Sequence, residues 1–287
     1  AVLRLLAEKA EKFSLETLGF SEKDRKKILE ALEKPYGMIL CTGPTGSGKT
    51  TSLYTIIKIL NKPEVSIITI EDPIEYSLEG VDQIQVNQRT GLTFATGLRS
   101  ILRQDPNIIM VGEIRDEETA GIAINASLTG HLLFSTLHTN DASTTLPRLL
   151  DMKIEPFLIA STVNIAIGQR LVRKICSNCK IKKTITEDKK RILAEVLSPK
   201  ILDNYKEFYE GKGCSKCNNT GYYSRIGIHE VLKVDDEIRE AITRRADASE
   251  IKEIAIKNGM TTMVKDGFQK VVKGITTIEE ILRVIHE

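Results

Sequence analysis

Short apolar runs alternate with longer amphipathic stretches from residue 34 to residue 171. The apolar runs are Met38–Leu40, Ile67–Ile70, Ile108–Val111 and Leu132–Phe134. Continuous apolar runs of this length are typical of strands that are buried on both faces of a parallel sheet. The stretches between them, such as Thr51–Leu60, have helical spacing. The pattern therefore predicts an α/β fold in which helices pack on the faces of a sheet.

The first 33 residues place charged and apolar side chains at helical spacing. Ser21, followed three residues later by Asp24, is a capping signal and predicts a helix over Glu22–Glu33. The sequence also starts in the middle of an amphipathic pattern. We therefore interpret residues 1–33 as a helical remnant of an upstream N-terminal domain with its linker, followed by the core at 34–171.

Two further patterns follow the core. Residues 172–225 are rich in lysine, asparagine and glycine, poor in apolar residues and bracketed by four cysteines, which indicates a separate module. Residues 226–287 begin with a short apolar segment and continue with three helix-like stretches. Thr277 and Glu280 form a capping box for the last of these helices. We predict a C-terminal helical subdomain.

The composition is that of an ordinary globular protein. The chain has 287 residues, a formal net charge of +2, 41% hydrophobic residues and 28% charged residues. Because the charge is nearly balanced, no basic excess argues by itself for a polyanionic partner. No apolar run reaches the roughly 18 residues that a membrane-spanning helix needs. We therefore expect an intracellular protein that docks to a membrane through partners.

Residues 43–50 match the phosphate-binding pattern G-x-x-x-x-G-K-[ST] between an apolar run and a helical stretch. Glycines let backbone N–H groups approach the phosphates, and the helix N-terminus adds partial positive charge. Lys49 should reach the β- and γ-phosphates, and Thr50 should supply a hydroxyl to Mg²⁺. The residues expected to bind ATP are Gly43, Pro44, Thr45, Gly46, Ser47, Gly48, Lys49, Thr50 and Thr51. Cys41, just before the loop, is expected to be a small buried apolar residue.

Hydrolysis also requires a group that activates water. An apolar run ends at Gly112 and Glu113, with Gly112 where a Walker B segment usually has Asp. Glu113 is therefore expected to be the water-polarising base or an indirect partner of Mg²⁺. A second acidic cluster, which includes Glu71 and Glu75, follows the run Ile67–Ile70. Active sites of α/β proteins form at such strand ends, although turn chemistry alone could explain this cluster.

Two histidines, His131 and His138, flank another predicted strand, which ends in small hydroxyl residues. A single histidine is more often structural than functional. Two of the chain's four histidines flank this one strand, which favours a functional role.

Four of the five cysteines form two C-x-x-C pairs, Cys176 with Cys179 and Cys214 with Cys217. Two such pairs in an apolar-poor module predict a structural zinc site with four thiolate ligands and no open position for a substrate. The spacer has a helix-like stretch, Glu187–Leu197, and can fold back to bring the pairs together. Disulfides and a catalytic dithiol are the alternatives, and the reducing compartment of a cytosolic ATPase disfavours disulfides.

Together with the segment Gly97–Pro106, these motifs resemble the secretion ATPases of the type II secretion and type IV pilus assembly superfamily. The likeness runs from about Val2 to the C-terminus. It implies a RecA-like P-loop core that works as a homohexamer on the cytoplasmic face of the inner membrane, with an inner-membrane platform protein as partner. A paired-cysteine element in this position is also found in the type II and pilus-extension members, whereas pilus-retraction members lack it.

The resemblance also implies roles for individual residues. In the family, Ile70–Tyr76, Ile108–Asp116 and Gly130–Asp141 are called the Asp, Walker B and His boxes. The resemblance implies Glu113 as catalytic carboxylate, Glu71 and Glu75 near Mg²⁺ and the attacking water, and His131 or His138 as sensor of the γ-phosphate.

Two arginines of the segment Gly97–Pro106 receive a role in the same way. The resemblance implies that Arg99 and Arg103 lie near the nucleotide, on the same subunit or across a subunit interface. From the residues alone they are two cations four positions apart on one helix face. Family members also carry an upstream domain that donates further arginines to a neighbour's nucleotide, and residues 2–18 correspond to its last helix.

Two uses of the hydrolysis stay open. A ring-shaped motor could drive protein secretion and the assembly of a pilus or pseudopilus, or a nucleic-acid translocase could grip DNA with the zinc module. The second use rests on a basic cluster within that module: Lys180, Lys182, Lys183, Lys189, Lys190 and Arg191. Aromatic residues for base stacking are not interleaved with them, which favours the first use, and we do not expect nucleic acid as a partner. A nucleotide-gated interaction module with negligible turnover is a third hypothesis.

Overall fold

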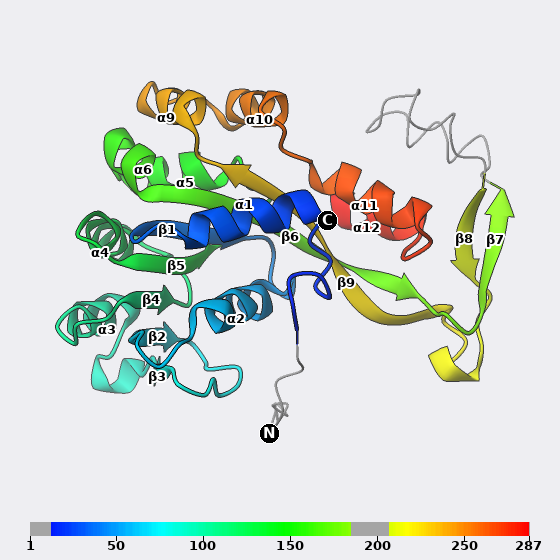
Figure 1. Cartoon of the computed structure of the whole chain (residues 1–287), viewed down its shortest axis with the longest axis horizontal. Coiled ribbons are helices and arrows are strands. Elements are labelled where there is room, and N and C mark those ends of the chain that lie inside the picture. Colours follow the sequence, from blue (N-terminus) through cyan, green and yellow to red (C-terminus); the bar gives the residue numbers. More distant parts are fainter. Residues whose placement is uncertain (1–12, 185–206, 287) are drawn as a thin grey trace. The chain divides into compact units, whose positions relative to one another are not determined.

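The computed structural model describes residues 13–184 and 207–286 (Figure 1). The chain divides into two compact units, one with residues up to 169 and 231–260, the other with 170–230 and 261 onward. The helix-like stretch Glu187–Leu197 and the start of the N-terminal segment lie outside the described residues. None of the helices within the described ranges combines the length and apolarity that crossing a membrane requires.

A seven-stranded sheet has the order β3-β2-β4-β5-β1-β6-β9. The first unit holds β1 to β5 entirely, with residues 163–169 of β6 and 231–233 of β9. The strands are β1 (Gly37–Thr42), β2 (Ile67–Glu71), β3 (Asp82–Gln85), β4 (Ile108–Val111), β5 (Leu132–Leu137), β6 (Val163–Ile175) and β9 (Tyr222–Lys233). From β3 to β6, every neighbouring pair is parallel. This confirms the predicted α/β class and all four predicted strands. Because parallel strands end at the same edge, β1, β2, β4 and β5 deliver their following residues to one place.

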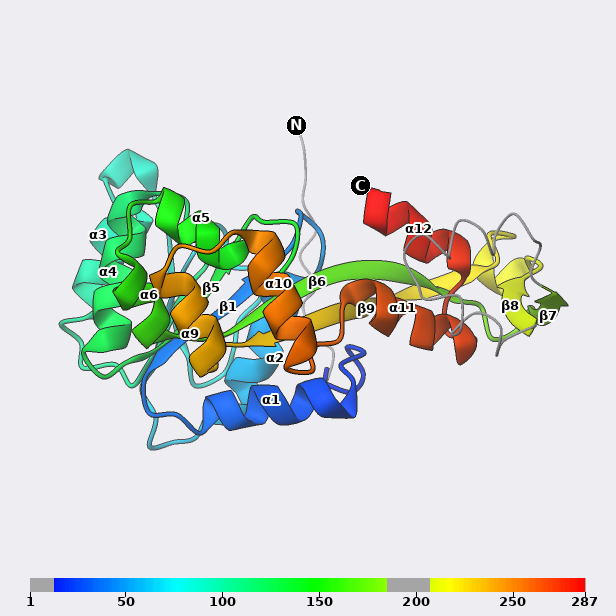
Figure 2. The same cartoon turned by 90° about the horizontal axis from the view of Figure 1, so that it is seen from above.

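Helices cover both faces of this sheet (Figure 2). The helices of the unit are α1 (Glu22–Leu32), α2 (Lys49–Leu60), α3 (Phe94–Ile101), α4 (Glu117–Leu128), α5 (Thr145–Asp151), α6 (Pro156–Thr162), α9 (Asp236–Thr243) and α10 (Ala248–Lys257). One apolar core packs α1 and α2 against one face, and a second packs the other six against the opposite face. Alternation along β1 serves both cores, since Ile39 belongs to the first and Leu40 to the second.

The N-terminal capping prediction is confirmed. Ser21 Oγ accepts from the backbone N–H of Asp24 at 3.1 Å and donates to the Asp24 carboxylate at 2.6 Å. The resulting helix, α1, buries Ile28 and Leu32 in the core shared with α2.

The second unit contains a two-stranded antiparallel sheet, β7 (Lys180–Thr184) with β8 (Glu207–Gly211). It also contains a short 3-10 turn, Ser215–Cys217, and two helices, α11 (Met263–Val272) and α12 (Ile278–His286). Its own apolar core includes Phe208 and Phe268, whose ring centroids are 6.1 Å apart.

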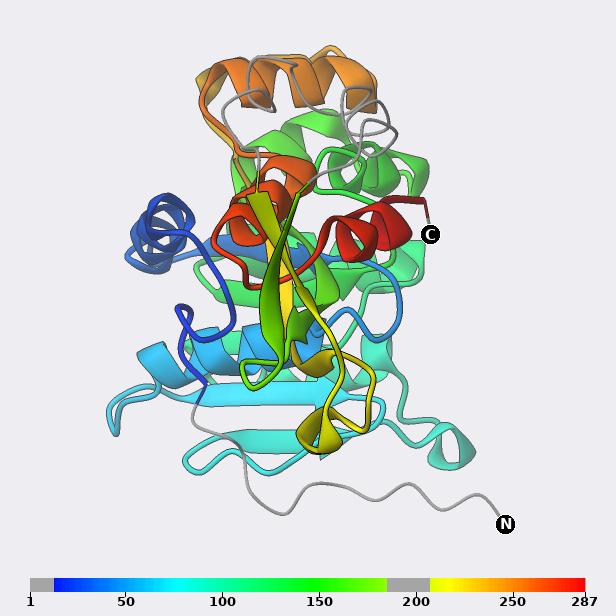
Figure 3. The same cartoon turned by 90° about the vertical axis from the view of Figure 1, so that its right-hand side faces the viewer.

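The C-terminal segment differs from its prediction. It forms four helices instead of three, and the boundary between the units divides it after residue 260. Helices α9 and α10 belong with the sheet, where Figures 1 and 3 show them beside α5 and α6, and α11 and α12 belong to the second unit. The division follows from packing: apolar residues of α9 and α10 enter the core of the first unit, and Phe268 enters the core of the second.

The predicted capping box of the last helix forms in only one direction. Thr277 Oγ1 accepts from the backbone N–H of Glu280 at 3.3 Å, as expected. The Glu280 carboxylate, however, accepts from the backbone and guanidinium of Arg173, both at 2.7 Å, and from Arg283 at 3.1 and 3.2 Å. Burial raises the pKa of Glu280, but these hydrogen bonds outweigh it and lower the pKa to about 2. This carboxylate therefore holds β6 and α12 together.

Candidate functional site

The predicted phosphate loop connects Thr42, at the end of β1, to Lys49, at the start of α2. Its residues Gly43, Gly46 and Gly48 have φ angles of 145°, 79° and 86°, a region that residues with a Cβ rarely adopt. Gly48 is the N-cap of α2 and offers no side chain to the N–H groups of the first turn. An anion at this point would meet those N–H groups and the positive end of the helix dipole.

Lys49 lies folded against the loop. Its Nζ donates to the carbonyl oxygens of Gly43 at 2.8 Å and Pro44 at 3.1 Å. Burial lowers its pKa, and the nearby charge of Glu113 opposes this shift. Phosphate oxygens are charged and accept hydrogen bonds more strongly than carbonyls do, so a bound phosphate can displace these two contacts.

The structure brings Glu113 and His138 together. Both follow neighbouring parallel strands, β4 and β5, in which Val111 pairs with Ser135. His138 Nε2 lies 3.1 Å from one carboxylate oxygen of Glu113, and an Arg115 nitrogen lies 2.5 Å from the other. Because an ionised carboxylate only accepts, this geometry requires the proton on His138 Nε2. Glu113 is 8% exposed. His138 and Arg115 hold its carboxylate in one orientation.

The segment that follows His138 is tied to the end of β1. Thr42 Oγ1 accepts from the backbone N–H of Thr139 at 3.1 Å, and the two threonine hydroxyls are hydrogen-bonded to each other. Two residues on, Asp141 pairs with Lys252 of α10 at 3.0 Å. Burial raises the pKa of Asp141, but hydrogen bonds from Thr144 and Lys252 lower it overall. These contacts fix His138 relative to the phosphate loop.

Glu71, the first carboxylate of the acidic cluster, is enclosed. Its carboxylate accepts from Thr69 at 2.6 Å, from Gln83 Nε2 at 3.1 Å and from the hydroxyl of Tyr54 on α2. Burial raises the pKa of Tyr54, and its bond to Glu71 raises it further. This network holds α2 against β2 and β3. It positions the helix that starts at the phosphate loop.

The remaining residues predicted for the site are not gathered at the loop. His131 lies before β5, beside Gly37 at the start of β1, and its Nδ1 is 3.1 Å from the carbonyl of Ala126. The six residues of β5 separate it from His138 by about 20 Å at strand spacing. Glu75 lies in the turn after β2 and is partly exposed.

The two predicted arginines lie at the surface of this chain. Arg99, on α3, pairs with Glu118 of α4 at 2.7 Å, and its side chain is about half exposed. Arg103 donates to Ser100 at 3.3 Å. Neither contact involves the phosphate loop.

The two cysteine pairs meet in the second unit. All four sulfur atoms lie within 4.8 Å of one another. The Cys176–Cys214 and Cys179–Cys217 separations are both 3.8 Å, and Cys214–Cys217 is 3.7 Å. These distances exclude disulfides, whose sulfurs are about 2.05 Å apart. A tetrahedron of sulfurs about 2.3 Å from a central zinc ion has edges of about 3.8 Å, so the four thiols fit zinc.

The side-chain amide of Asn178 stabilises the thiolate form of Cys214. Asn178 Nδ2 donates to Cys214 Sγ at 3.4 Å and is the main cause that lowers the pKa of Cys214 to about 6. The thiolate is the form that binds metal.

The three residues of the basic cluster that the structure describes, Lys180, Lys182 and Lys183, each have a partner. Lys182 pairs with Glu207 at 2.8 Å and Lys183 with Glu210 at 2.7 Å across the β7–β8 hairpin. Lys180 stacks on the ring of Tyr209, 4.1 Å from its centroid. The other three, Lys189, Lys190 and Arg191, lie outside the described residues. This pairing reduces the charge available to a nucleic acid.

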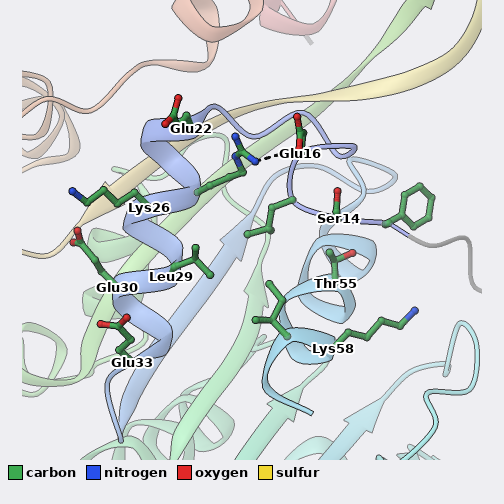
Figure 4. Close-up of a pocket in the computed structure, with 13 residues that line it drawn as sticks. Ser14, Glu16, Glu22, Lys26, Leu29, Glu30, Glu33, Thr55 and Lys58 are labelled. Atoms are coloured by element: carbon green, nitrogen blue, oxygen red, sulfur yellow. Dashed lines mark hydrogen bonds and ion pairs between the residues drawn. The ribbon is translucent and has the colours of Figure 1, made fainter. Parts of the chain in front are cut away.

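A cavity of about 680 Å³ lies between α1 and α2 (Figure 4). Leu29 and Ile59 contribute to its apolar lining, and charged residues such as Glu22, Lys26 and Lys58 surround them. None of the predicted site residues lines it, so it is distinct from the phosphate loop.

Two residues near the loop escaped the sequence analysis. Arg115 stands two positions after Glu113, a local signal that could have been used. Gln169, in the middle of β6, carries no local signal, because its contacts with the loop and with α2 cross more than 110 positions of sequence. Cys41 is buried as predicted, and burial raises its pKa to about 12.

Comparison with known proteins gives a consistent picture. The family model described as "Type II/IV secretion system protein" matches residues 1–283. The chain is 48% identical over 282 residues to the type IV pilus assembly ATPase PilB of Thermus thermophilus, which covers 98% of the chain and 31% of that relative. It is 47% identical over 286 residues to the type II secretion system protein E of Aeromonas hydrophila, which covers 100% of the chain and 56% of that relative.

Solved structures agree with these sequence relatives. The pilus retraction motor PilT with bound ADP superposes with a TM-score of 0.71 at 30% identity, covering 97% of this chain and 68% of PilT. The ATPase DotB of Legionella pneumophila gives a TM-score of 0.69 at 26% identity, covering 99% and 67%. The chain thus spans 31% and 56% of the lengths of the two curated relatives.

Proposed function

The chain is a member of the type II/IV secretion system protein family, and from this premise we propose that it is the ATP-hydrolysing part of a motor for pilus assembly or protein secretion. The observation that carries the proposal is the convergence of the phosphate loop, Lys49, Glu113 and His138 at the carboxyl edge of one parallel sheet. A P-loop core of the RecA-like kind has its nucleotide site at this edge.

Each residue of the site has a distinct task in this proposal. The loop N–H groups and Lys49 hold the β- and γ-phosphates, and Thr50 offers its hydroxyl to Mg²⁺. Mg²⁺, when bound, neutralises charge on the phosphates. Glu113 accepts a proton from, and orients, the water that attacks the γ-phosphate. His138, with its proton on Nε2, keeps the carboxylate oriented and can donate to the γ-phosphate when nucleotide is present.

For the other predicted residues we propose the places that membership of the family implies. We propose Arg99 and Arg103 as groups that reach the nucleotide of a neighbouring subunit in a homohexamer, which requires Arg99 to leave Glu118. Glu71 and Glu75 are proposed near the Mg²⁺ side of the site. Of the two histidines, we retain His138, because its ring already contacts Glu113.

We further propose that the four cysteines hold one structural zinc ion. The support is the spacing of their sulfur atoms, which fits a four-sulfur tetrahedron. With all four positions filled by protein, the ion would stabilise the second unit instead of taking part in hydrolysis.

The work performed by the motor follows from the relatives. PilB is named as a pilus assembly ATPase and protein E as a type II secretion protein. We propose that a ring of this chain works at the cytoplasmic face of the inner membrane and acts on a platform protein there. The paired lysines of the cysteine module give the nucleic-acid translocase no support.

ATP hydrolysis per chain, measured against protein concentration with and without linear DNA, tests the proposal. We expect a rate that rises with concentration, because a ring assembles, and that ignores DNA. Strong stimulation by DNA would overturn the motor for secretion or pili in favour of a translocase. Absence of turnover at every concentration would refute hydrolysis by this chain alone.

Two variants assign the chemistry. Lys49→Ala should abolish turnover and weaken nucleotide binding, because the charge that faces the phosphates is lost. Glu113→Gln should retain nucleotide binding and lose at least about a hundredfold in turnover, a typical loss for a catalytic proton acceptor. The matched control is Glu117→Gln, because Glu117 is an exposed carboxylate that pairs with Lys153. This variant should hydrolyse ATP like the wild type. Wild-type turnover in Glu113→Gln would remove Glu113 from the mechanism.

A further inference from the structure

A buried glutamine in the middle of β6, one residue past the end of the pairing of β6 with β1, contacts the phosphate loop. Gln169 is 2% exposed. In the register of β1 with β6, Thr42 pairs with Gly168, so Gln169 is the next residue and lies beside the first residue of the loop. A Cβ on Gly43 would lie 2.3 Å from the Gln169 carbonyl oxygen, which shows how closely the two backbones approach.

The side-chain amide of Gln169 connects the loop to the helix that follows it. Its Nε2 donates to the carbonyl oxygen of Ser47 at 2.8 Å, and its Oε1 accepts from the hydroxyl of Ser52 on α2 at 2.7 Å. Both contacts are buried. The amide therefore satisfies a donor on the helix and an acceptor on the loop at once, and it can do so in only one orientation.

The bond to Ser47 determines where the next N–H points. A trans peptide is planar, and its C=O and N–H groups point in opposite directions. When Gln169 binds the Ser47 carbonyl from the protein interior, the N–H of Gly48 must point away from the interior, to the side where a phosphate binds. Gly48 can take this orientation because its φ of 86° is accessible to glycine.

We propose that Gln169 is a positioning residue for nucleotide phosphates, which fixes the Ser47–Gly48 peptide so that the Gly48 N–H faces the phosphate before nucleotide binds. It acts through the loop and does not itself touch the nucleotide. A donor already aimed at its target needs no reorganisation on binding, so its loss should appear as weaker nucleotide binding. This inference rests on the proposed nucleotide site.

Binding of ADP with Mg²⁺, measured by titration calorimetry, tests the proposal. Gln169→Met retains the length of the side chain and removes both hydrogen bonds. We expect about tenfold weaker ADP binding, the equivalent of one buried acceptor left without its donor. Ser52→Ala removes the hydrogen bond to Gln169 Oε1 and leaves the bond from Nε2 to Ser47. We expect a smaller loss of ADP affinity in this variant.

The chain offers a matched control on the same strand. Asn164 is also buried, donates to the Tyr36 carbonyl at 3.1 Å and accepts from Lys34 at 2.9 Å, but it lies at the amino end of β6, away from the phosphate loop. Asn164→Leu removes a comparable amide and should change ADP affinity less than about twofold, whatever it does to stability. An equal loss of ADP affinity in Gln169→Met and Asn164→Leu would overturn the proposal.

A pH profile separates positioning from general destabilisation. In Gln169→Glu, the protonated carboxyl can donate to Ser47, whereas the carboxylate repels that carbonyl. Relative to wild type, ADP binding by this variant should therefore be weak at pH 8 and recover as the pH falls, since burial raises the pKa of the new carboxyl. A pH-independent ratio to wild type would overturn the proposal, even if Gln169→Met fails to fold.

The control for the site itself is Lys49→Ala. If wild type binds no ADP, or if Lys49→Ala binds it equally well, the proposed nucleotide site fails and this inference fails with it. If Lys49→Ala loses binding and the Gln169 variants bind like wild type, only the role of Gln169 is refuted.

Discussion

Removing one hydroxyl should reveal how firmly α2 is held behind the phosphate loop. Tyr54 and Glu71 are 0% and 2% exposed, and the Tyr54 hydroxyl donates to Glu71 Oε2. Thr69 and Gln83 both bind the other oxygen, Oε1. Tyr54→Phe thus leaves a buried, charged oxygen without this donor, and hydrogen bonds to charged groups contribute about 1.5–3 kcal/mol. We expect a loss of about 2 kcal/mol in the free energy of unfolding.

The assay is thermal and urea unfolding of wild type and variants. For a unit of this size, a loss of about 2 kcal/mol lowers Tm by roughly 4–8 °C. Tyr76→Phe is the control: its ring packs edge-on against Tyr54 at 4.8 Å, and within the described residues its hydroxyl has no hydrogen bond. It should change stability by less than about 0.5 kcal/mol.

A double-mutant cycle with Glu71→Gln distinguishes a structural carboxylate from a catalytic one. If Glu71 holds Tyr54, the losses in stability should be non-additive by about 1–2 kcal/mol. If Tyr54→Phe is as stable as Tyr76→Phe, and Glu71→Gln stops hydrolysis without affecting unfolding, then Glu71 serves the chemistry and the reasoning from its hydrogen bonds is refuted.

Three further predictions concern the second unit and the buried thiol. Elemental analysis should find about one zinc per chain, and a strong chelator should lower the unfolding midpoint of the second unit while ADP binding persists; protein without zinc would refute the metal site. Glu280→Gln should destabilise by about 1–3 kcal/mol at pH 7, a range reduced because Arg173 and Arg283 are partly exposed. The pKa of Glu280 is lowered from 4.5 to about 2. Its contribution to the free energy of unfolding is therefore complete above about pH 5 and is lost as the pH falls toward 2. The unfolding curves of variant and wild type should converge in acid, and a difference in stability that persists at pH 2 would contradict this. Cys41, whose pKa burial raises to about 12, should resist thiol reagents until the protein unfolds, and rapid labelling of native protein would show that it is accessible.

Local sequence determined the elements and the phosphate loop. The apolar runs became β1, β2, β4 and β5, and the capping signal at Ser21 started α1, because each depends on residues close together in the chain. The glycines of the loop and Lys49 could be assigned in the same way, since strand, loop and helix are consecutive.

The sequence was a poorer guide for side chains whose partners lie far away in the chain. Glu280 has the spacing of a capping box, yet its carboxylate binds Arg173, more than 100 positions earlier, because a guanidinium and a backbone N–H offer it stronger, charge-assisted contacts. The sequence does not distinguish His131 from His138, because they flank the same strand. Only the parallel pairing of β4 with β5 places His138, and not His131, beside Glu113.

The sequence by itself thus determined the fold class and the local motifs: an α/β core, a nucleotide loop and four cysteines with the spacing of metal ligands. The tertiary structure decided which groups meet: His138 with Glu113, Glu71 with Tyr54, the four sulfurs with one another, and Gln169 with the loop. The physical reason is the range of the interactions. Strand, helix and turn preferences depend on a few consecutive residues, whereas the orientation of a buried carboxylate or amide depends on donors that only the packing of distant segments brings within 3 Å.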